Sequence, residues 1–351
     1  MVTSILLSCR VGKRLALLAL TPLAAAVANK SSLHSQAGAG TAKSTLNLTS
    51  TNTCSSSGDS SSSGSSSSSG AKGLFKDDMQ TINYAIYRPD YPDLLYDRIF
   101  KYSKTARFDS AADLATGSGQ AAKALAKKFT SVVGIDVSVQ QLQNAGDSSN
   151  IIFKVGSAED TKLPSSSLDL VTVAQALHWF DLPSFYAEAN RVLRKDASLA
   201  VWGYDAAVIL PREGASQREA AATAAANRLL LAIYNDEPLG PHWDARRRLV
   251  DSHYVGLEPR PPLFYDVQRF DGDISIIKEV ALEDLVGYVR TWSSYTTYMK
   301  KYGVQTGHAD RDPAEVLHRE LLRVYRVDLT EAPTKVLLSW PLFLVLATCS
   351  K

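Results

Sequence analysis

The sequence predicts an α/β fold in which a mostly parallel sheet is covered by helices on both faces. Between residues 109 and 136 an apolar segment, a glycine turn, a helical stretch and a second apolar segment follow one another. Strand patterns then alternate with helical patterns as far as residue 203, as expected for parallel strands joined by crossover helices. Two apolar runs near the C-terminus lie too close together for such a crossover, so we expect them to pair antiparallel.

The first 70 residues differ in composition from the rest of the chain. Up to Gly58 they contain no Asp or Glu, and residues 15–28 are apolar apart from Thr21 and Pro22. This pattern is typical of a targeting segment, either a transit peptide for a mitochondrion or plastid or a secretory signal. The alternative is an N-terminal extension that carries no targeting signal, on a cytoplasmic protein. Residues 55–70 are almost entirely Ser and Gly, which predicts a flexible linker.

The folded domain is expected to span residues 73–351, after a targeting segment and linker at 1–72. With 33 basic and 35 acidic residues beyond residue 70, no general surface for nucleic acid is expected. The apolar run at 15–28 is shorter than the roughly 20 residues of a membrane span, and no span is expected in the domain. Cys349 is the one cysteine beyond residue 70, which excludes an intradomain disulfide and a cysteine-based zinc site, and no metal is expected.

The glycine turn at residues 116–119 is the first candidate binding site. Gly117 and Gly119 allow a tight turn at the start of a helix, where a ligand can approach the main chain. Asp136 ends the second strand about 20 residues later, where a carboxylate can accept hydrogen bonds from ribose hydroxyls. The turn therefore predicts an adenosine-containing ligand. Residues 117–122 also fit a dinucleotide fingerprint, so the glycines alone leave the ligand open.

The elements that follow bring further side chains to the same edge of the sheet. Ser138 is a plausible N-cap for a helix through Asn144, and Asp181 for a later helix. We expect the third, fourth and fifth strands at residues 151–155, 168–174 and 198–203. Ligands of such sheets bind beyond the carboxyl ends of the strands, where the loops after these strands meet.

The remainder of the chain predicts a helical region and a final hairpin. Residues 218–233 and 282–301 read as helices, and Asp312-Pro313 opens another. The apolar runs at 334–339 and 342–348 are joined only by Trp340-Pro341. We therefore expect these two runs to form an antiparallel hairpin.

Residues 80–348 resemble the class I S-adenosylmethionine-dependent methyltransferases with a methyltransferase type 11 domain. The resemblance lies in D-L-A-T-G-S-G at 113–119, in Asp136, and in segments 156–164 and 168–171. Segments 87–92, 174–180 and 290–295 resemble the branch that includes trans-aconitate methyltransferase. The resemblance implies a Rossmann-like seven-stranded sheet, mostly parallel with an antiparallel C-terminal hairpin. It also implies a helical substrate cover within 205–330, inserted after the fifth strand, and S-adenosyl-L-methionine as cofactor.

The resemblance also implies which residues bind the cofactor. They are Tyr87, Arg88, Ala115, Gly117, Gly119, Asp136, Ser157, Ala158, Glu159 and Gln175. Two of them depart from the family pattern, since Ala115 stands at a usual glycine and Ser157 at a frequent Asp.

The nature of the methyl acceptor decides which further residues the reaction needs. A carboxylate acceptor needs no base but needs cationic clamps, for which Arg88 and Arg290 are candidates, with Trp179 and Trp292 as walls. A hydroxyl or amine acceptor would require a base, and His178 is the candidate for that catalytic role. The sequence thus favours transfer of a methyl group to a small molecule, with a carboxylate oxygen as the preferred acceptor.

Two other functions are compatible with the same residues. Ala115 and Ser157 allow a catalytically inactive partner subunit that only binds S-adenosylmethionine. An NAD-dependent oxidoreductase is the less favoured alternative, because no tyrosine has a lysine four residues further on, as short-chain dehydrogenases require.

Overall fold

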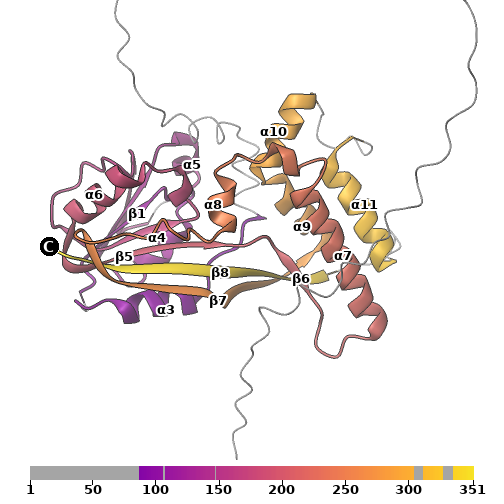
Figure 1. Cartoon of the computed structure of the whole chain (residues 1–351), viewed down its shortest axis with the longest axis horizontal. Helices are drawn as coiled ribbons and strands as arrows, with labels where there is room; N and C mark the ends of the chain where they lie inside the picture. Colours follow the sequence, from indigo (N-terminus) through magenta and orange to yellow (C-terminus); the bar gives the residue numbers. More distant parts are fainter. Residues whose placement is uncertain (1–86, 106, 147, 304–310, 327–334) are drawn as a thin grey trace, which may run out of the picture. The chain divides into compact units, whose positions relative to one another are not determined.

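The computed structural model describes residues 87–105, 107–146, 148–303, 311–326 and 335–351 (Figure 1). The targeting segment and linker predicted at 1–72 lie outside these residues. The helices are α3 (Asp93–Tyr102), α4 (Gln120–Ala126), α5 (Val139–Gln143), η1 (Leu177–Trp179), α6 (Leu182–Val192), α7 (Gln217–Asn235), η2 (Gly240–His242), α8 (Arg247–Asp251), α9 (Leu282–Arg290), α10 (Ser293–Tyr302) and α11 (Pro313–Tyr325). The strands are β1 (Ser110–Leu114), β2 (Ser131–Asp136), β3 (Ile151–Val155), β4 (Leu168–Ala174), β5 (Leu193–Tyr204), β6 (Val208–Leu210), β7 (Phe264–Ala281) and β8 (Lys335–Cys349).

The strands form one sheet whose order confirms the predicted fold class. Hydrogen-bonded neighbours follow the order β3-β2-β1-β4-β5-β8-β6, and β7 also pairs with β8. The first five strands are parallel, whereas β8 runs antiparallel to β5, β6 and β7. The carboxyl ends of the parallel strands therefore meet at one edge, as a doubly wound sheet requires.

An antiparallel C-terminal strand pair is present as predicted, but the turn expected at Trp340-Pro341 is wrong, because residues 335–348 belong to the single strand β8. Its antiparallel partner is β7, which pairs with it from Phe264 to Ala281. On its other side β8 pairs with β5 from Leu342 onward and with β6 up to Ser339. Pro341 lies in the gap between these two partners, and its carbonyl accepts a hydrogen bond from Asp205 N. The missing N–H of this proline would point to the same side as its carbonyl, away from β7, so the pairing of β8 with β7 loses no hydrogen bond there.

The region between β5 and β8 contains the predicted helices. It also contains two strands that were not predicted, β6 and β7. Helices α7, α9, α10 and α11 gather near β6, at one end of the sheet (Figure 1). The helix expected at 282–301 is two helices, because Trp292 takes an extended conformation between α9 and α10. Its indole is 2% exposed and packs against the rings of Tyr234, Trp243 and Tyr288, which stabilises the break.

Helices cover both faces of the sheet, as predicted. The core on one face contains Leu95 of α3 and Leu125 of α4, and the core on the other contains Phe185 of α6 and Val250 of α8. Among the described residues, no helix is long and apolar enough to cross a membrane.

Candidate active site

The turn between β1 and α4 has left-handed backbone at three positions. The angle φ is 54° at Ala115, 57° at Gly117 and 79° at Gly119, which is the N-cap of α4. A Cβ at Gly119 would lie 2.8 Å from Cζ of Phe153, so both the conformation and the packing demand glycine. A Cβ at Gly117 would only come within 3.8 Å of Gln141 Oε1, so the conformation alone favours glycine there.

Because Ala115 carries a Cβ in this conformation, we expect Ala115→Gly to raise the free energy of unfolding. The left-handed region costs a non-glycine residue about 1–2 kcal/mol, and the larger entropy of an unfolded glycine offsets part of that gain. The net gain should be at most about 1 kcal/mol, measured by urea unfolding. As a control, Ala112→Gly in β1, where no left-handed conformation occurs, should destabilise the fold. Destabilisation by Ala115→Gly would contradict the proposed strain.

Asp113, near the end of β1, connects the turn to β4 through its carboxylate. Its carboxylate accepts hydrogen bonds from the hydroxyls of Thr116 at 2.6 Å and Thr172 at 2.7 Å. Burial raises the pKa of Asp113 to about 6, although these hydrogen bonds oppose the rise.

Asp136 ties the same turn to the end of β2. One carboxylate oxygen accepts from Gly117 N and the other from Ser138 N, each at 2.8 Å. Burial raises the pKa of Asp136, and these backbone N–H groups oppose the rise. A carboxylate has about four acceptor sites, so beside these backbone groups it can still accept a hydrogen bond from a ribose hydroxyl. The prediction for Ser138 is confirmed, since its hydroxyl caps α5 by accepting from Gln141 N.

The loop after β3 presents the segment predicted to contact adenine. The Ser157 hydroxyl donates to the Glu159 carboxylate and accepts from Glu159 N at 3.1 Å, while Ala158 is buried. Glu159 Oε1 also accepts from Asp181 N, at 3.0 Å. The loop therefore has a fixed conformation between β3 and the start of α6.

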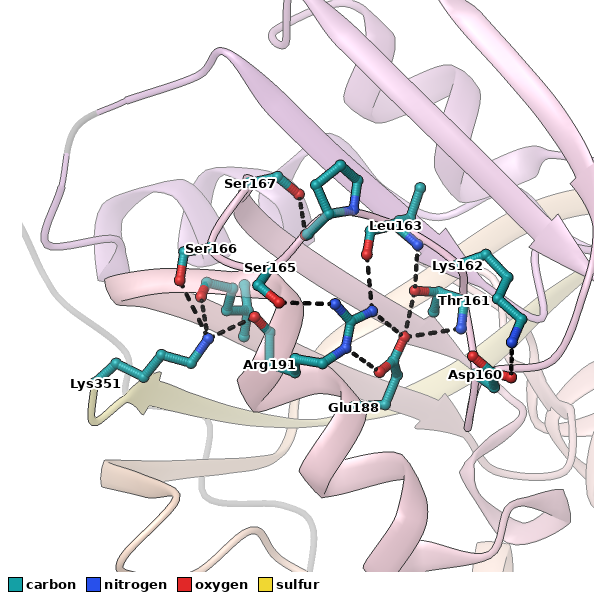
Figure 2. Close-up of polar contacts among 12 residues, drawn as sticks. Asp160, Thr161, Lys162, Leu163, Ser165, Ser166, Ser167, Glu188, Arg191 and Lys351 are labelled. Atoms are coloured by element: carbon teal, nitrogen blue, oxygen red, sulfur yellow. Dashed lines mark hydrogen bonds and ion pairs between the residues drawn. The ribbon is translucent and has the colours of Figure 1, made fainter.

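Figure 2 shows the polar network that anchors the next part of this loop. Glu188 of α6 accepts from the backbone N–H and the hydroxyl of Thr161, at 2.8 and 2.5 Å. Arg191 donates to both oxygens of Glu188 and to the Leu163 carbonyl. Despite the opposing effect of burial, the hydrogen bonds from Arg191 and Thr161 lower the pKa of Glu188 to about 2. The network thus fastens the β3–β4 loop to α6.

These residues fit the adenosine and amino-acid parts of S-adenosylmethionine. The left-handed turn, Asp136 and the 157–159 segment follow β1, β2 and β3, so all of them lie at the carboxyl edge of the sheet. The main chain of the turn would face the amino-acid part, the carboxylate of Asp136 the ribose, and the 157–159 segment the adenine. Among the described residues no group of three metal-ligating side chains lies close enough to hold an ion.

A cavity of about 90 Å³ adjoins this edge and brings together four of the predicted site residues. Arg88, Gln175, His178 and Trp179 line it, together with Trp243, Asp244, Arg247, Thr291 and Ser293. Gln175 lies just after β4, with φ of 53°, and its side-chain amide donates to the Tyr204 carbonyl at 3.1 Å. A larger cavity of about 570 Å³ among α7, α10 and α11 contains none of the predicted site residues.

Arg88 is held in the wall of this cavity by hydrogen bonds to Thr291 and Tyr204. Its Nε donates to the Thr291 hydroxyl at 3.0 Å, and its two terminal nitrogens donate to the Tyr204 hydroxyl at 2.7 Å and the Thr291 carbonyl at 3.4 Å. The guanidinium also lies 5.3 Å from the ring centroid of Tyr288. The preceding residue, Tyr87, packs its ring against Gly287 of α9, where a Cβ would come within 2.5 Å of it.

The other two predicted acceptor residues do not line the cavity. Arg290 pairs with Glu315 and, at 3.5 Å, with Asp312, so it joins α9 to the start of α11. Trp292 lies behind Trp243, with 5.6 Å between their ring centroids, and supports the cavity wall from outside.

His178 meets Tyr254 across the cavity wall. The distance from His178 Nδ1 to the Tyr254 hydroxyl is 2.9 Å, and the two rings are nearly parallel. Burial, followed by the nearby charges of Arg247 and Arg246, lowers the pKa of His178 to about 3. The imidazole is therefore uncharged at neutral pH.

The sequence reasoning missed the segment that closes the cavity from the cover side. Trp243 and Asp244 come from the stretch between α7 and α8, and Arg247 is the first residue of α8. Arg246 pairs with Asp244 and lies 4.5 Å from the Trp179 ring centroid. The run W-D-A-R-R-R at 243–248, in which an aromatic residue precedes three arginines, is the signal that could have indicated an anion site.

Comparisons with known proteins agree with this geometry. Residues 112–201 match the methyltransferase domain family model. A Dictyostelium discoideum protein classed as a methyltransferase is 32% identical over 78% of this chain and 95% of its own. A Saccharomyces cerevisiae protein classed as an S-adenosylmethionine-dependent methyltransferase, CRG1, is 25% identical over 76% of this chain and 94% of its own.

A solved structure extends the agreement to the fold. The protein, classed as a type II methyltransferase from Anaeromyxobacter dehalogenans, is 26% identical, with a TM-score of 0.59 over 74% of this chain and 97% of its own. With its left-handed glycine turn, its acid at the end of β2 and this similarity over the domain, the chain belongs to the class I methyltransferases whose cofactor is S-adenosylmethionine.

Proposed function

We propose that the protein transfers a methyl group to a carboxylate oxygen of a small molecule in the 90 Å³ cavity. The observation that carries the proposal is Arg247, whose Nε is buried without a hydrogen-bond partner while its side chain lines the cavity. Its guanidinium pairs with Asp251 at 3.1 Å and lies against the rings of Tyr234 and Trp243. A buried donor without an acceptor is costly, and a bound carboxylate would satisfy it.

The other residues of the wall support the same acceptor. Arg88 adds a second guanidinium to the wall of the same cavity. When bound, S-adenosylmethionine supplies a methyl group on a positively charged sulfur, which a carboxylate oxygen can accept without losing a proton. The residues of the cavity then need only bind the anion, orient it and exclude water. The resemblance of segments 87–92, 174–180 and 290–295 to the trans-aconitate branch points to the same chemistry.

A turnover screen tests the proposal. The protein is incubated with S-adenosylmethionine and panels of small carboxylic acids, phenols and amines, and S-adenosylhomocysteine is measured. We expect turnover with members of the carboxylic acid panel only. Turnover of phenols or amines alone would overturn the carboxylate proposal. Cofactor binding without turnover of any panel would favour the inactive partner subunit instead.

Arg88→Lys is expected to reduce turnover at least tenfold, or about 1.4 kcal/mol in the barrier. Lysine keeps the charge, but a single ammonium cannot replace a planar group that donates to Thr291 and Tyr204 at once. Steady-state kinetics with both substrates measure the effect. A rise confined to the KM of the cofactor would assign Arg88 to the cofactor's carboxylate. A rise confined to the KM of the methyl acceptor would assign Arg88 to the substrate.

Arg98→Lys is the matched control, since Arg98 pairs with Asp273 on the surface of the same N-terminal region and lines no described cavity. This control should leave turnover unchanged. Unchanged kinetics in both Arg88→Lys and Arg88→Ala would contradict a role for Arg88 in the site.

A further inference from the structure

His178 and Tyr254 form a buried pair whose hydrogen bond has a defined direction. The Tyr254 side chain is 1% exposed, so water cannot compete for its hydroxyl. Among the described residues, the hydrogen-bond partner of this hydroxyl is His178 Nδ1, and a buried O–H that donates to nothing is costly. The proton of the Tyr254 hydroxyl is then directed to His178 Nδ1, 2.9 Å away. Nδ1 is therefore the acceptor, and in an uncharged imidazole the proton must reside on Nε2.

The charges around the pair keep the imidazole in this uncharged state. Arg246 and Arg247 face His178 from the cover and disfavour a positive ring, and only Asp244 opposes them. Arg88 lines the same cavity. Burial raises the pKa of the Tyr254 phenol, so Tyr254 keeps its proton. Neither partner changes its charge near neutral pH.

The backbone that carries Tyr254 is held in an unfavourable conformation. His253 and Tyr254 both have left-handed backbone, with φ of 55° and 59°. His253 contacts Asp205 with Nε2 at 2.7 Å and Asp271 with Nδ1 at 3.2 Å, and its ring stacks on Phe343. Two consecutive residues in this region cost a few kcal/mol unless their surroundings impose it. The contacts of His253 therefore fix where the Tyr254 hydroxyl lies.

We propose that His178 is an uncharged hydrogen-bond donor, through Nε2–H, to the acceptor carboxylate, and that Tyr254 is the positioning residue that sets this tautomer. The inference rests on the proposed acceptor site and deepens it. It replaces the expectation that His178 acts as a base, because a nitrogen that already carries a proton cannot remove one from a phenol or an amine. The site therefore suits acceptors that are already ionised, which is the property of a carboxylate.

The tautomer is tested without any substrate. In the full-length protein labelled with ¹⁵N at its six histidines, the resonances that disappear in His178→Gln belong to His178. We expect these resonances to show a protonated Nε2 and an unprotonated Nδ1, with no change between about pH 5 and 8. A protonated Nδ1, or an imidazolium that titrates in this range, would overturn the inference.

Tyr254→Phe removes the hydroxyl and keeps the ring. We expect the Nε2–H form to lose its preference, so that the His178 resonances shift toward a mixture of tautomers. Tyr186→Phe is the matched control, because the Tyr186 hydroxyl donates to the Leu257 carbonyl of the same loop and not to His178. Identical His178 resonances in wild type and Tyr254→Phe would contradict the positioning role.

A kinetic experiment separates this inference from the proposed function. With a carboxylic acid that the screen shows to be methylated, His178→Gln should retain most turnover, because its amide can still donate. His178→Phe should lose about tenfold or more in kcat/KM for the acid, the scale of one hydrogen bond to a charged group. A pH dependence of kcat/KM that vanishes in His178→Gln would identify a base and overturn the inference. If no carboxylic acid is methylated, the proposed function fails, while the resonances still decide the tautomer.

Discussion

Glu188→Ala is expected to lower the free energy of unfolding by about 3 kcal/mol at neutral pH. The pKa of Glu188 is about 2 in the folded protein against 4.5 for a free side chain, and each pKa unit corresponds to about 1.4 kcal/mol. The side chain is only 9% exposed, so solvent screens its contacts with Thr161 and Arg191 little. Figure 2 shows the contacts that the substitution removes, and urea unfolding measures the loss.

The sign of the pH dependence follows from the lowered pKa. The contribution of Glu188 is fully present above about pH 5 and is lost as the pH falls through 4.5 toward 2. The difference between wild type and Glu188→Ala should therefore be constant above about pH 5 and shrink below it.

Glu320→Ala provides the matched control for Glu188→Ala. Glu320 also pairs with an arginine three residues further on, Arg323, but the two side chains are 40% and 73% exposed. Such a surface pair contributes at most about 1 kcal/mol, so Glu320→Ala should have little effect. Equal effects of the two substitutions would show that the buried network at Glu188 does not stabilise the fold.

Asp136→Ala is expected to weaken binding of S-adenosylmethionine by about 1.5–3 kcal/mol, the scale of a hydrogen bond to a charged group. The carboxylate is the acceptor proposed for the ribose hydroxyls, and it also holds Gly117 N and Ser138 N at 2.8 Å. Its removal therefore deletes a ligand contact and loosens the turn that faces the ligand. Isothermal titration calorimetry with S-adenosylmethionine or its demethylated product measures the change.

Ser138→Ala separates these two effects. It removes the cap of α5, whose oxygen accepts from Gln141 N at 3.3 Å, and leaves the Asp136 carboxylate in place. We expect a weaker helix start and an affinity close to that of wild type. Equal affinities of wild type and Asp136→Ala would remove Asp136 from the cofactor site.

Local patterns are sufficient to predict the geometry of the turn, the acid and the helix cap that form the proposed cofactor half of the site. The turn around Gly117 and Gly119, the acid at Asp136 and the cap at Ser138 lie within one strand–helix–strand unit and the helix start that follows it, so sequence spacing determines their geometry. The parallel arrangement of the first five strands follows from the same alternation of strands and helices.

The acceptor half depends on contacts that no local pattern contains. Arg88, His178 and Arg247 meet in one cavity although they lie in segments far apart in the sequence. The same holds for Tyr254, which reaches His178 from 76 residues away. Arg290 was predicted for this cavity on chemical type alone, and its nearest anions in the fold are Glu315 and Asp312.

The class of the protein, the glycine turn and the acid that faces it can be predicted from the residues alone, because they depend on backbone conformation and on residues close along the chain. That residues 335–349 form one strand, and that its partner is β7, is known only from the folded chain, since strand pairing is a non-local choice. The charge and the tautomer of His178 also depend on the tertiary structure. They are set by burial, by arginines from another segment and by the direction of one hydroxyl. None of these can be predicted from the residues next to His178 in the sequence.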